Sequence, residues 1–131
     1  MTTPFETAFT IDTSSIKYGA GVTREVGYEI SRMGAKRVMV ITDSNLTHSE
    51  PIATVMDSIR AEGIDAVLFD QVSVEPTDIS MKQAIAFATD GNFDGYVAVG
   101  GGSSIDTAKT ANLYATYPAD FLAYVNAPIG E

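Results

Sequence analysis

A glycine-rich segment holds the residues whose types and spacing could do chemistry. Gly100-Gly101-Gly102-Ser103 follows an apolar run at residues 96–99 and precedes a segment with helical spacing. Three glycines after a buried strand let the backbone turn tightly, and free N–H groups at the start of the next helix favour an anion such as a pyrophosphate. The Ser103 hydroxyl adds a donor. The segment therefore predicts an anion-binding turn; the alternative is a plain strand-to-helix turn with Ser103 as N-cap.

Neither standard phosphate-binding motif fits this segment. The dinucleotide fingerprint requires its third glycine where Ile105 stands, and a P-loop requires glycine before its lysine, where Ala108 stands. Asp106 and Lys109 lie one helical turn apart, so they could simply pair on the helix surface. The residues alone thus predict a turn suited to phosphate and do not name the ligand.

The elements that must position this turn alternate between strand and helix. Three apolar runs are typical of buried parallel strands: residues 38–41, 67–69 and 96–99. Three helical stripes follow them: residues 52–59, 81–88 and 105–115. Glycines stand where the first two of these helices should end, at Gly63 and Gly91. This order predicts an α/β fold with a Rossmann-like parallel sheet flanked by helices. Because such a sheet usually has more strands, we expect it to be incomplete.

The N-terminal part of the chain predicts a β-hairpin and one further helix. Residues 7–12 alternate between apolar and polar side chains, and Ile16-Lys17-Tyr18 could return antiparallel after a turn. Apolar residues at helical spacing follow over residues 22–33, with Gly34 as the expected stop. The strand around Phe9 would offer an edge through which two copies could form a homodimer.

Composition and charge bound the class of protein. The chain has 131 residues, enough for one domain, and its 45% hydrophobic and 19% charged residues are ordinary for a globular protein. Its 17 acids and 8 bases give a net charge of −9, which disfavours nucleic acid and anionic membrane as partners. There is no cysteine, and the N-terminus does not resemble a signal or transit peptide. We therefore expect a cytoplasmic protein.

Several segments resemble the iron-dependent alcohol dehydrogenase family. The pattern Gly-Gly-Gly-Ser-x-x-Asp-x-Ala-Lys at residues 100–109 is similar to the hallmark of that family. Other segments agree in order and spacing: residues 16–19, 40–43 and 74–78. Three segments further resemble its hydroxyacid–oxoacid transhydrogenase branch: residues 75–78, 111–114 and 127–130. The resemblance implies that residues 1–131 form an N-terminal NAD-binding α/β domain, which in the family precedes a helical domain that holds the metal.

The resemblance also implies roles for residues of the glycine-rich turn and of the first parallel strand. Gly102 and Ser103 are expected to contact the cofactor pyrophosphate, and Gly101 to shape the turn. Asp43 matches the acidic residue that accepts hydrogen bonds from the adenosine ribose, which favours NAD because a 2′-phosphate would meet a negative charge. The alternative for Asp43 is a helix N-cap or an Asx turn ahead of Asn45.

Two further acidic residues match cofactor positions of the family. Glu75 stands at a cofactor-lining position that many relatives fill with Asn, and a solvated loop residue is the alternative for it. Asp106 is expected to face the cleft because of its place in the family motif. The resemblance leaves Lys109 as a structural residue.

The metal ligands of the family have no counterpart in this chain. The family holds Fe²⁺ or Zn²⁺ through one Asp and three His, whereas the single histidine here, His48, lies in a polar loop and is typical of the surface. The Thr-rich cofactor loop of relatives is expected beyond Glu131. We therefore expect a truncated part of an NAD-linked dehydrogenase for an alcohol or hydroxy acid, inactive by itself. The alternatives are a stand-alone nucleotide-binding module and a lyase related to dehydroquinate synthase, which Ser103 disfavours.

Overall fold

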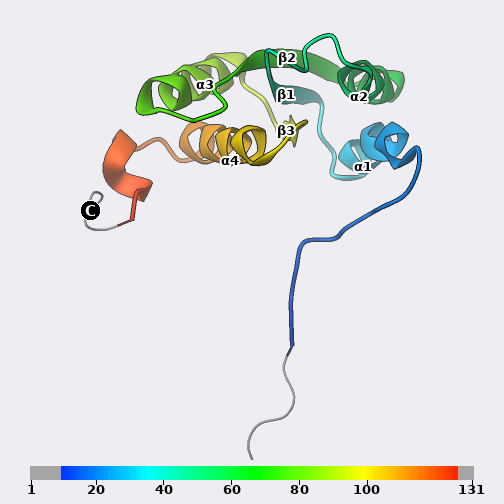
Figure 1. Cartoon of the computed structure of the whole chain (residues 1–131), viewed down its shortest axis with the longest axis horizontal. Coiled ribbons are helices and arrows are strands. Elements are labelled where there is room, and N and C mark those ends of the chain that lie inside the picture. The colour runs from blue at the N-terminus through cyan, green and yellow to red at the C-terminus, as the bar shows by residue number, and fades with distance from the viewer. Residues whose placement is uncertain (1–9, 127–131) are drawn as a thin grey trace, which may run out of the picture.

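The computed structural model describes residues 10–126 and has a small parallel sheet with helices on both faces (Figure 1). The strands are β1 (Arg37–Asp43), β2 (Asp65–Val72) and β3 (Gly95–Ala98), in the order β2-β1-β3. The α-helices are α1 (Val26–Arg32), α2 (Glu50–Ala61), α3 (Asp78–Gly91) and α4 (Gly102–Thr116). Two 3₁₀ helices complete the described part: η1 (Val22–Glu25) and η2 (Phe121–Tyr124). The expected α/β fold with a parallel sheet is confirmed.

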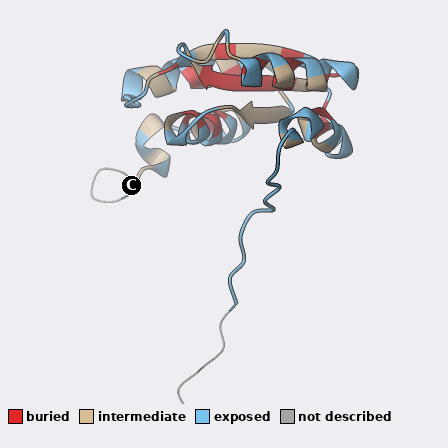
Figure 2. Cartoon of the chain, turned by 45° about the vertical axis from the view of Figure 1, so that its right-hand side comes forward, coloured by how far each residue is buried: buried red, intermediate tan, exposed pale blue. Residues whose placement is uncertain are grey.

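Strand β1 forms the centre of the protein. It pairs in parallel with β2 on one side and with β3 on the other, and residues 38–42 have no exposed surface. Val38 and Val40 pack against α1 and α2, whereas Met39 and Ile41 pack against α3 and α4. Figure 2 shows buried residues on strands of the sheet and on parts of the helices beside it. An unbroken apolar run is what a strand covered on both faces requires.

Helices α1 and α2 are held together by a close contact at a glycine. The backbone N–H of Gly27 donates to the Ser58 hydroxyl at 2.9 Å, and that hydroxyl donates to the Arg24 carbonyl at 2.7 Å. A Cβ atom at Gly27 would lie 2.0 Å from the Ser58 carbonyl oxygen, well inside van der Waals contact. Only glycine therefore permits this approach of the two helices.

A single carboxylate ties two turns together at the edge where the strands begin. Asp94 accepts the backbone N–H groups of Arg37 and Lys36, each at 2.9 Å. These N–H groups, that of Arg37 first, lower the pKa of the Asp94 carboxyl below its ordinary value. The carboxylate thereby joins the start of β1 to the turn that precedes β3.

The expected N-terminal hairpin is not present in the described part of the chain. Ile16-Lys17-Tyr18 forms no strand, and the segment extends away from the body of the protein (Figure 1). The side chains of Ile16 and Tyr18 are 82% and 98% exposed, so neither gains burial from pairing. Lys17 attaches the segment to the helices through ion pairs, at 2.8 Å from Glu25 and 3.1 Å from Glu29. The strand expected around Phe9 and the segment 127–130 lie outside the described residues.

The expected helix stops are confirmed at all three glycines, although only two of these glycines adopt the left-handed conformation. Gly34 and Gly63 follow α1 and α2 with φ of 82° and 75°. Behind α3 the left-handed residue is Asn92, with φ of 51°, rather than Gly91. At Gly91 the Phe93 ring occupies the space of a side chain, 2.1 Å from a built Cβ. The glycine at this helix end provides room for an aromatic ring and not the left-handed turn.

We predict that Gly27→Ala destabilises the fold. The added methyl group must push α1 away from α2 and strain two hydrogen bonds, which should lower the free energy of unfolding by about 1–3 kcal/mol. Urea denaturation measures this. Gly102→Ala is the matched control, because a Cβ there meets no atom within 4 Å. Equal stability of the Gly27→Ala variant and the wild type would contradict the close contact.

Candidate functional site

The candidate residues gather where the strands β1 and β3 end. The connections from β1 and from β2 lead to opposite sides of β1, which makes the gap between β1 and β3 a topological switch point. In open α/β sheets, ligands bind outside the carboxyl ends of strands at such a point. Asp43 ends β1 there, and the glycine-rich turn follows β3. The two segments that the sequence singled out are thus brought together.

Two hydrogen bonds join the end of β1 to the start of the glycine-rich turn. The backbone N–H of Val99 donates to the Ile41 carbonyl at 2.9 Å, and the Thr42 hydroxyl donates to the Val99 carbonyl at 2.7 Å. Thr42 is fully buried, so this side-chain bond is shielded from water. It fixes where the chain leaves the sheet before it turns into α4.

The turn itself depends on Gly100, the first of the three glycines, and not on Gly101. Gly100 has φ of 142°, whereas Gly101, expected to shape the turn, has φ of −89°. A Cβ atom at Gly100 would lie 2.8 Å from the Ser104 hydroxyl and 3.4 Å from Leu46. The backbone conformation and the contact therefore both require glycine at the first of the three positions.

The first turn of α4 presents free donors to open space. Gly101 is the N-cap and provides no side-chain cap, and the first backbone bond of the helix runs from the Ile105 N–H to the Gly101 carbonyl at 3.2 Å. The N–H groups of the three residues before Ile105 therefore lack intrahelical partners. A Cβ at Gly101 or Gly102 would meet nothing within 4 Å. This turn has the donors, the dipole and the room that a phosphate group needs.

Below the turn lies a buried hydroxyl without a partner. Ser104 is 1% exposed, and its Oγ makes no hydrogen bond within the described residues. The atom faces Gly100, since a Cβ built on that glycine lies 2.8 Å from it. An unpaired donor under the free N–H groups adds to the positive potential of the turn, so an anion fits this place. The residue was not predicted, because a Ser inside a helix carries no such signal.

Asp43 ends β1, as expected, and it also forms the Asx turn that was one alternative for it. Its Oδ1 accepts the backbone N–H of Asn45 at 2.8 Å, which is an Asx turn, and its carbonyl accepts the N–H of Leu46 at 3.1 Å. The side chain is half-buried. The turn uses one carboxylate oxygen and leaves the other as an acceptor for a ligand hydroxyl. The Asx turn thus orients the Asp43 side chain and leaves one of its carboxylate oxygens unbonded within the turn.

Ser103 and Glu75 are linked through the loop between β2 and α3. The Ser103 hydroxyl donates to the carbonyl of Val74, the residue before Glu75. Ser103 is the second residue of α4, so the expected alternative of Ser103 as N-cap is wrong.

Glu75 is exposed, as is Asp106 on α4. Asp106 and Lys109 form no ion pair within the described residues, so the helix-surface pairing considered for them is not present.

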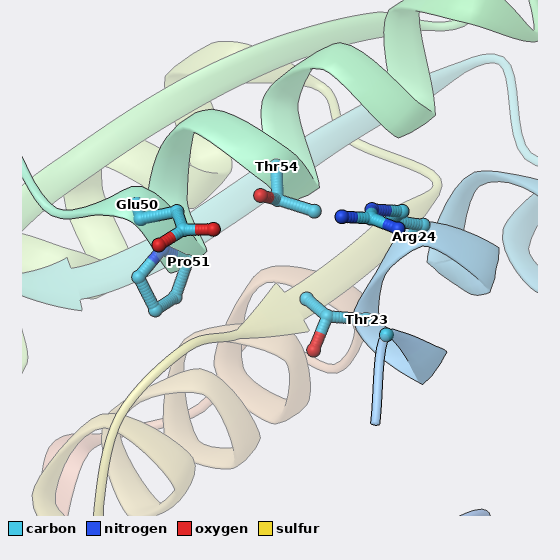
Figure 3. Close-up of a pocket in the computed structure, with 6 residues that line it drawn as sticks. Thr23, Arg24, Glu50, Pro51 and Thr54 are labelled. Carbon is cyan, nitrogen blue, oxygen red and sulfur yellow. The ribbon is translucent and has the colours of Figure 1, made fainter. Parts of the chain in front are cut away.

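Two hollows near the glycine-rich turn and the start of α2 do not enclose the candidate residues. A groove of about 740 Å³ runs beside β3, from Gly100 along Val97 to α1 and the N-terminal segment. A smaller pocket of about 320 Å³ lies between η1 and the start of α2, where Thr23, Arg24 and Glu50 converge (Figure 3). Neither is lined by Asp43, Glu75 or Ser103. The candidate site is therefore an open surface at the strand ends.

The described residues hold no cluster suited to a metal ion. Over residues 10–126, no group of three or more His, Cys, Asp or Glu side chains converges. His48 is exposed in the loop after β1. In the same part of the chain, no helix is both long enough and apolar enough to cross a lipid bilayer.

Comparison with known proteins decides the family. Residues 13–130 match the family model described as iron-containing alcohol dehydrogenase. This chain belongs to the iron-containing alcohol dehydrogenase family. The expected resemblance to that family is thereby confirmed.

Relatives within the iron-containing alcohol dehydrogenase family support the branch that the sequence indicated. The chain is 56% identical over 125 residues to the mitochondrial hydroxyacid-oxoacid transhydrogenase of Bos taurus and 54% identical to that of Homo sapiens. Each match covers 95% of this chain and 27% of the relative. The chain therefore spans about a quarter of the length of these relatives.

Solved structures of the family share the fold of this chain. It is similar to NADH-dependent butanol dehydrogenase A from Thermotoga maritima, with a TM-score of 0.80, 25% identity, and coverage of 88% of this chain and 30% of that one. It is also similar to a 1,3-propanediol oxidoreductase, with a TM-score of 0.78, 28% identity, and coverage of 82% and 28%.

The expected cytoplasmic location is wrong on this comparison. The bovine, mouse and human relatives are all named as mitochondrial proteins. The expectation rested on the lack of cysteine and of a targeting segment. The lack of cysteine does not distinguish one reducing compartment from another. The chain spans only about a quarter of these relatives, so its first residues do not decide the question either.

We predict that Ser104→Ala stabilises the protein without ligand. A buried hydroxyl that lacks a partner costs about 1–3 kcal/mol, so its removal should raise the free energy of unfolding by roughly 1 kcal/mol. The matched control is Thr42→Val, which deletes a buried hydroxyl that does donate, and should lower that free energy by about 1 kcal/mol. Chemical denaturation of the three proteins compares them. Loss of stability in Ser104→Ala would show that an ordered water satisfies the hydroxyl.

Proposed function

We propose that this chain is the NAD-binding portion of a longer oxidoreductase that transfers hydride between a hydroxy acid and NAD. The observation that carries the proposal is the first turn of α4, whose free N–H groups face open space at the switch point. The high identity to transhydrogenases of hydroxy and oxo acids favours a hydroxy acid over a simple alcohol as substrate. The structural similarity to an NADH-dependent enzyme supports the choice of nucleotide.

The residues at the strand ends divide the work of holding the nucleotide. The N–H groups of Gly102 and Ser103 take the pyrophosphate, aided by the dipole of α4. The free carboxylate oxygen of Asp43 accepts a ribose hydroxyl, and its charge disfavours a 2′-phosphate. Glu75 and Asp106 line the same site from the β2–α3 loop and from α4. When bound, NAD supplies the acceptor for the hydride.

The metal implied by the family name does not fit the described residues. Three or more convergent His or carboxylate ligands are the minimum for a catalytic ion, and residues 10–126 bring no such group together. We propose that Fe²⁺ or Zn²⁺ in the whole protein binds residues outside this chain. The described residues contribute nucleotide binding.

We predict that Asp43→Asn weakens NAD binding in the complete protein. The loss of one charge-assisted hydrogen bond should cost about 1.5–3 kcal/mol, or roughly a 10- to 150-fold rise in the dissociation constant. The preference for NAD over NADP should also narrow, because an amide does not repel a 2′-phosphate. Isothermal titration calorimetry with both nucleotides measures these changes. Unchanged constants would leave Asp43 with its Asx turn as its only role.

We predict that Gly102→Val abolishes NAD binding and leaves the protein folded. The valine side chain would occupy the open space in front of the helix N–H groups, where no protein atom lies within 4 Å of a built Cβ. Gly102 has no positive φ, so the side chain brings little backbone strain. Calorimetry reports binding, and circular dichroism reports the fold. Gly102→Ala should show a smaller loss; normal affinity in the valine variant would exclude this turn as the phosphate site.

A further inference from the structure

Two hydroxyl groups hold the loop that carries Glu75. The Ser103 hydroxyl, on α4, donates to the Val74 carbonyl, and the Ser73 hydroxyl donates to the Glu75 carbonyl at 2.9 Å. These two carbonyls belong to the peptide planes immediately before and after Glu75. Both planes are therefore anchored, one of them from another element of the fold.

The residue after Glu75 restricts the backbone conformation of Glu75 further. Pro76 follows directly, and a residue before proline is confined to extended backbone conformations. Thr77 then caps α3 through a reciprocal pair of bonds with Ser80, at 2.9 and 3.1 Å. The point and direction at which the Glu75 side chain leaves the backbone are thus preset, although the side chain itself is exposed.

The Ser103 hydroxyl cannot donate to the Val74 carbonyl and to a phosphate at the same time. A serine hydroxyl has one proton, and here the Val74 carbonyl receives it. A pyrophosphate oxygen only accepts hydrogen bonds, so it could not bind the lone pairs that Ser103 has left. The N–H groups at the start of α4 are free for the phosphate in any case.

We propose that Ser103 is a positioning residue, whose hydroxyl holds Glu75 against the sugar hydroxyls of the nucleotide and does not bind its phosphate. A carboxylate beside a dinucleotide must point at hydroxyl or amide donors and away from phosphate, because like charges repel. A firmly held backbone meets this requirement. The proposal rests on the proposed function for the identity of the ligand, and on the loop contacts alone for the role of Ser103.

The first test measures the loop in the complete protein without nucleotide. Hydrogen–deuterium exchange at the amides of Thr77 and Ser80 should be about tenfold faster in Ser103→Ala, because one anchor of the loop is lost. Ser103→Thr retains the hydroxyl and should restore the wild-type rates. The matched control is Thr89→Ala, which deletes a hydroxyl bonded to the Ile85 carbonyl at 2.8 Å elsewhere on α3. Wild-type rates in Ser103→Ala would overturn the proposal.

The second test uses titration calorimetry to distinguish a role of Ser103 in holding the loop from a role in binding the phosphate. Ser103→Ala and Glu75→Gln should each weaken NAD binding about tenfold, and the double variant should be no weaker than either one. Binding of inorganic pyrophosphate should be unchanged in Ser103→Ala. Additive losses, or weaker pyrophosphate binding, would place the hydroxyl on the phosphate and overturn the proposal. If the wild type binds no NAD, the proposed function fails, and the exchange rates alone decide the role of Ser103.

Discussion

The junction between the end of β1 and the start of the glycine-rich turn is the interaction on which the candidate site depends. The Thr42 hydroxyl and the Ile41 carbonyl both bind Val99, so the chain leaves β3 at a set distance from Asp43. Since β1 is packed on both faces, it cannot move to follow a displaced turn. The Asp43 carboxylate and the start of α4 are therefore placed by one buried strand. Their spacing is a property of the core and not of the loops.

The sequence predicts those features that depend on residues close together along the chain. The apolar runs and glycine stops locate β1, α2 and β2, because burial in a core requires regularly spaced apolar residues and helix ends favour glycine. The glycine-rich turn is found for the same reason. The Asx turn of Asp43, the bond from Ser103 to Val74 and the partnerless Ser104 join groups that only the fold brings together, so no pattern indicates them. The hairpin was expected from alternation alone, yet Ile16 and Tyr18 find no surface to cover in the described part.

An anion site in so acidic a protein needs a source of positive potential other than side chains. The candidate residues include Asp43, Glu75 and Asp106 and no lysine or arginine, and the chain carries a net charge of −9. Backbone N–H groups and the dipole of α4 supply attraction without titrating, and they act only over the first turn of the helix. In the proposed site, these donors would attract the phosphate, and each carboxylate would accept a sugar hydroxyl beside it, which would favour a sugar phosphate over a bare anion.

The one-sided pairing of β2 and β3 decides what kind of assembly this chain could enter by itself. Within residues 10–126 each of these strands has a single neighbour, β1, so the sheet has two free edges that run in the same direction. Joining β3 of one copy to β2 of the next would be a heterologous contact, which propagates as an open filament and does not close into a pair. Asp65 and Asp70 lie on β2, and excess negative charge would accumulate with every added copy. Net charge would therefore oppose such polymerisation, and low pH or high salt would weaken this opposition.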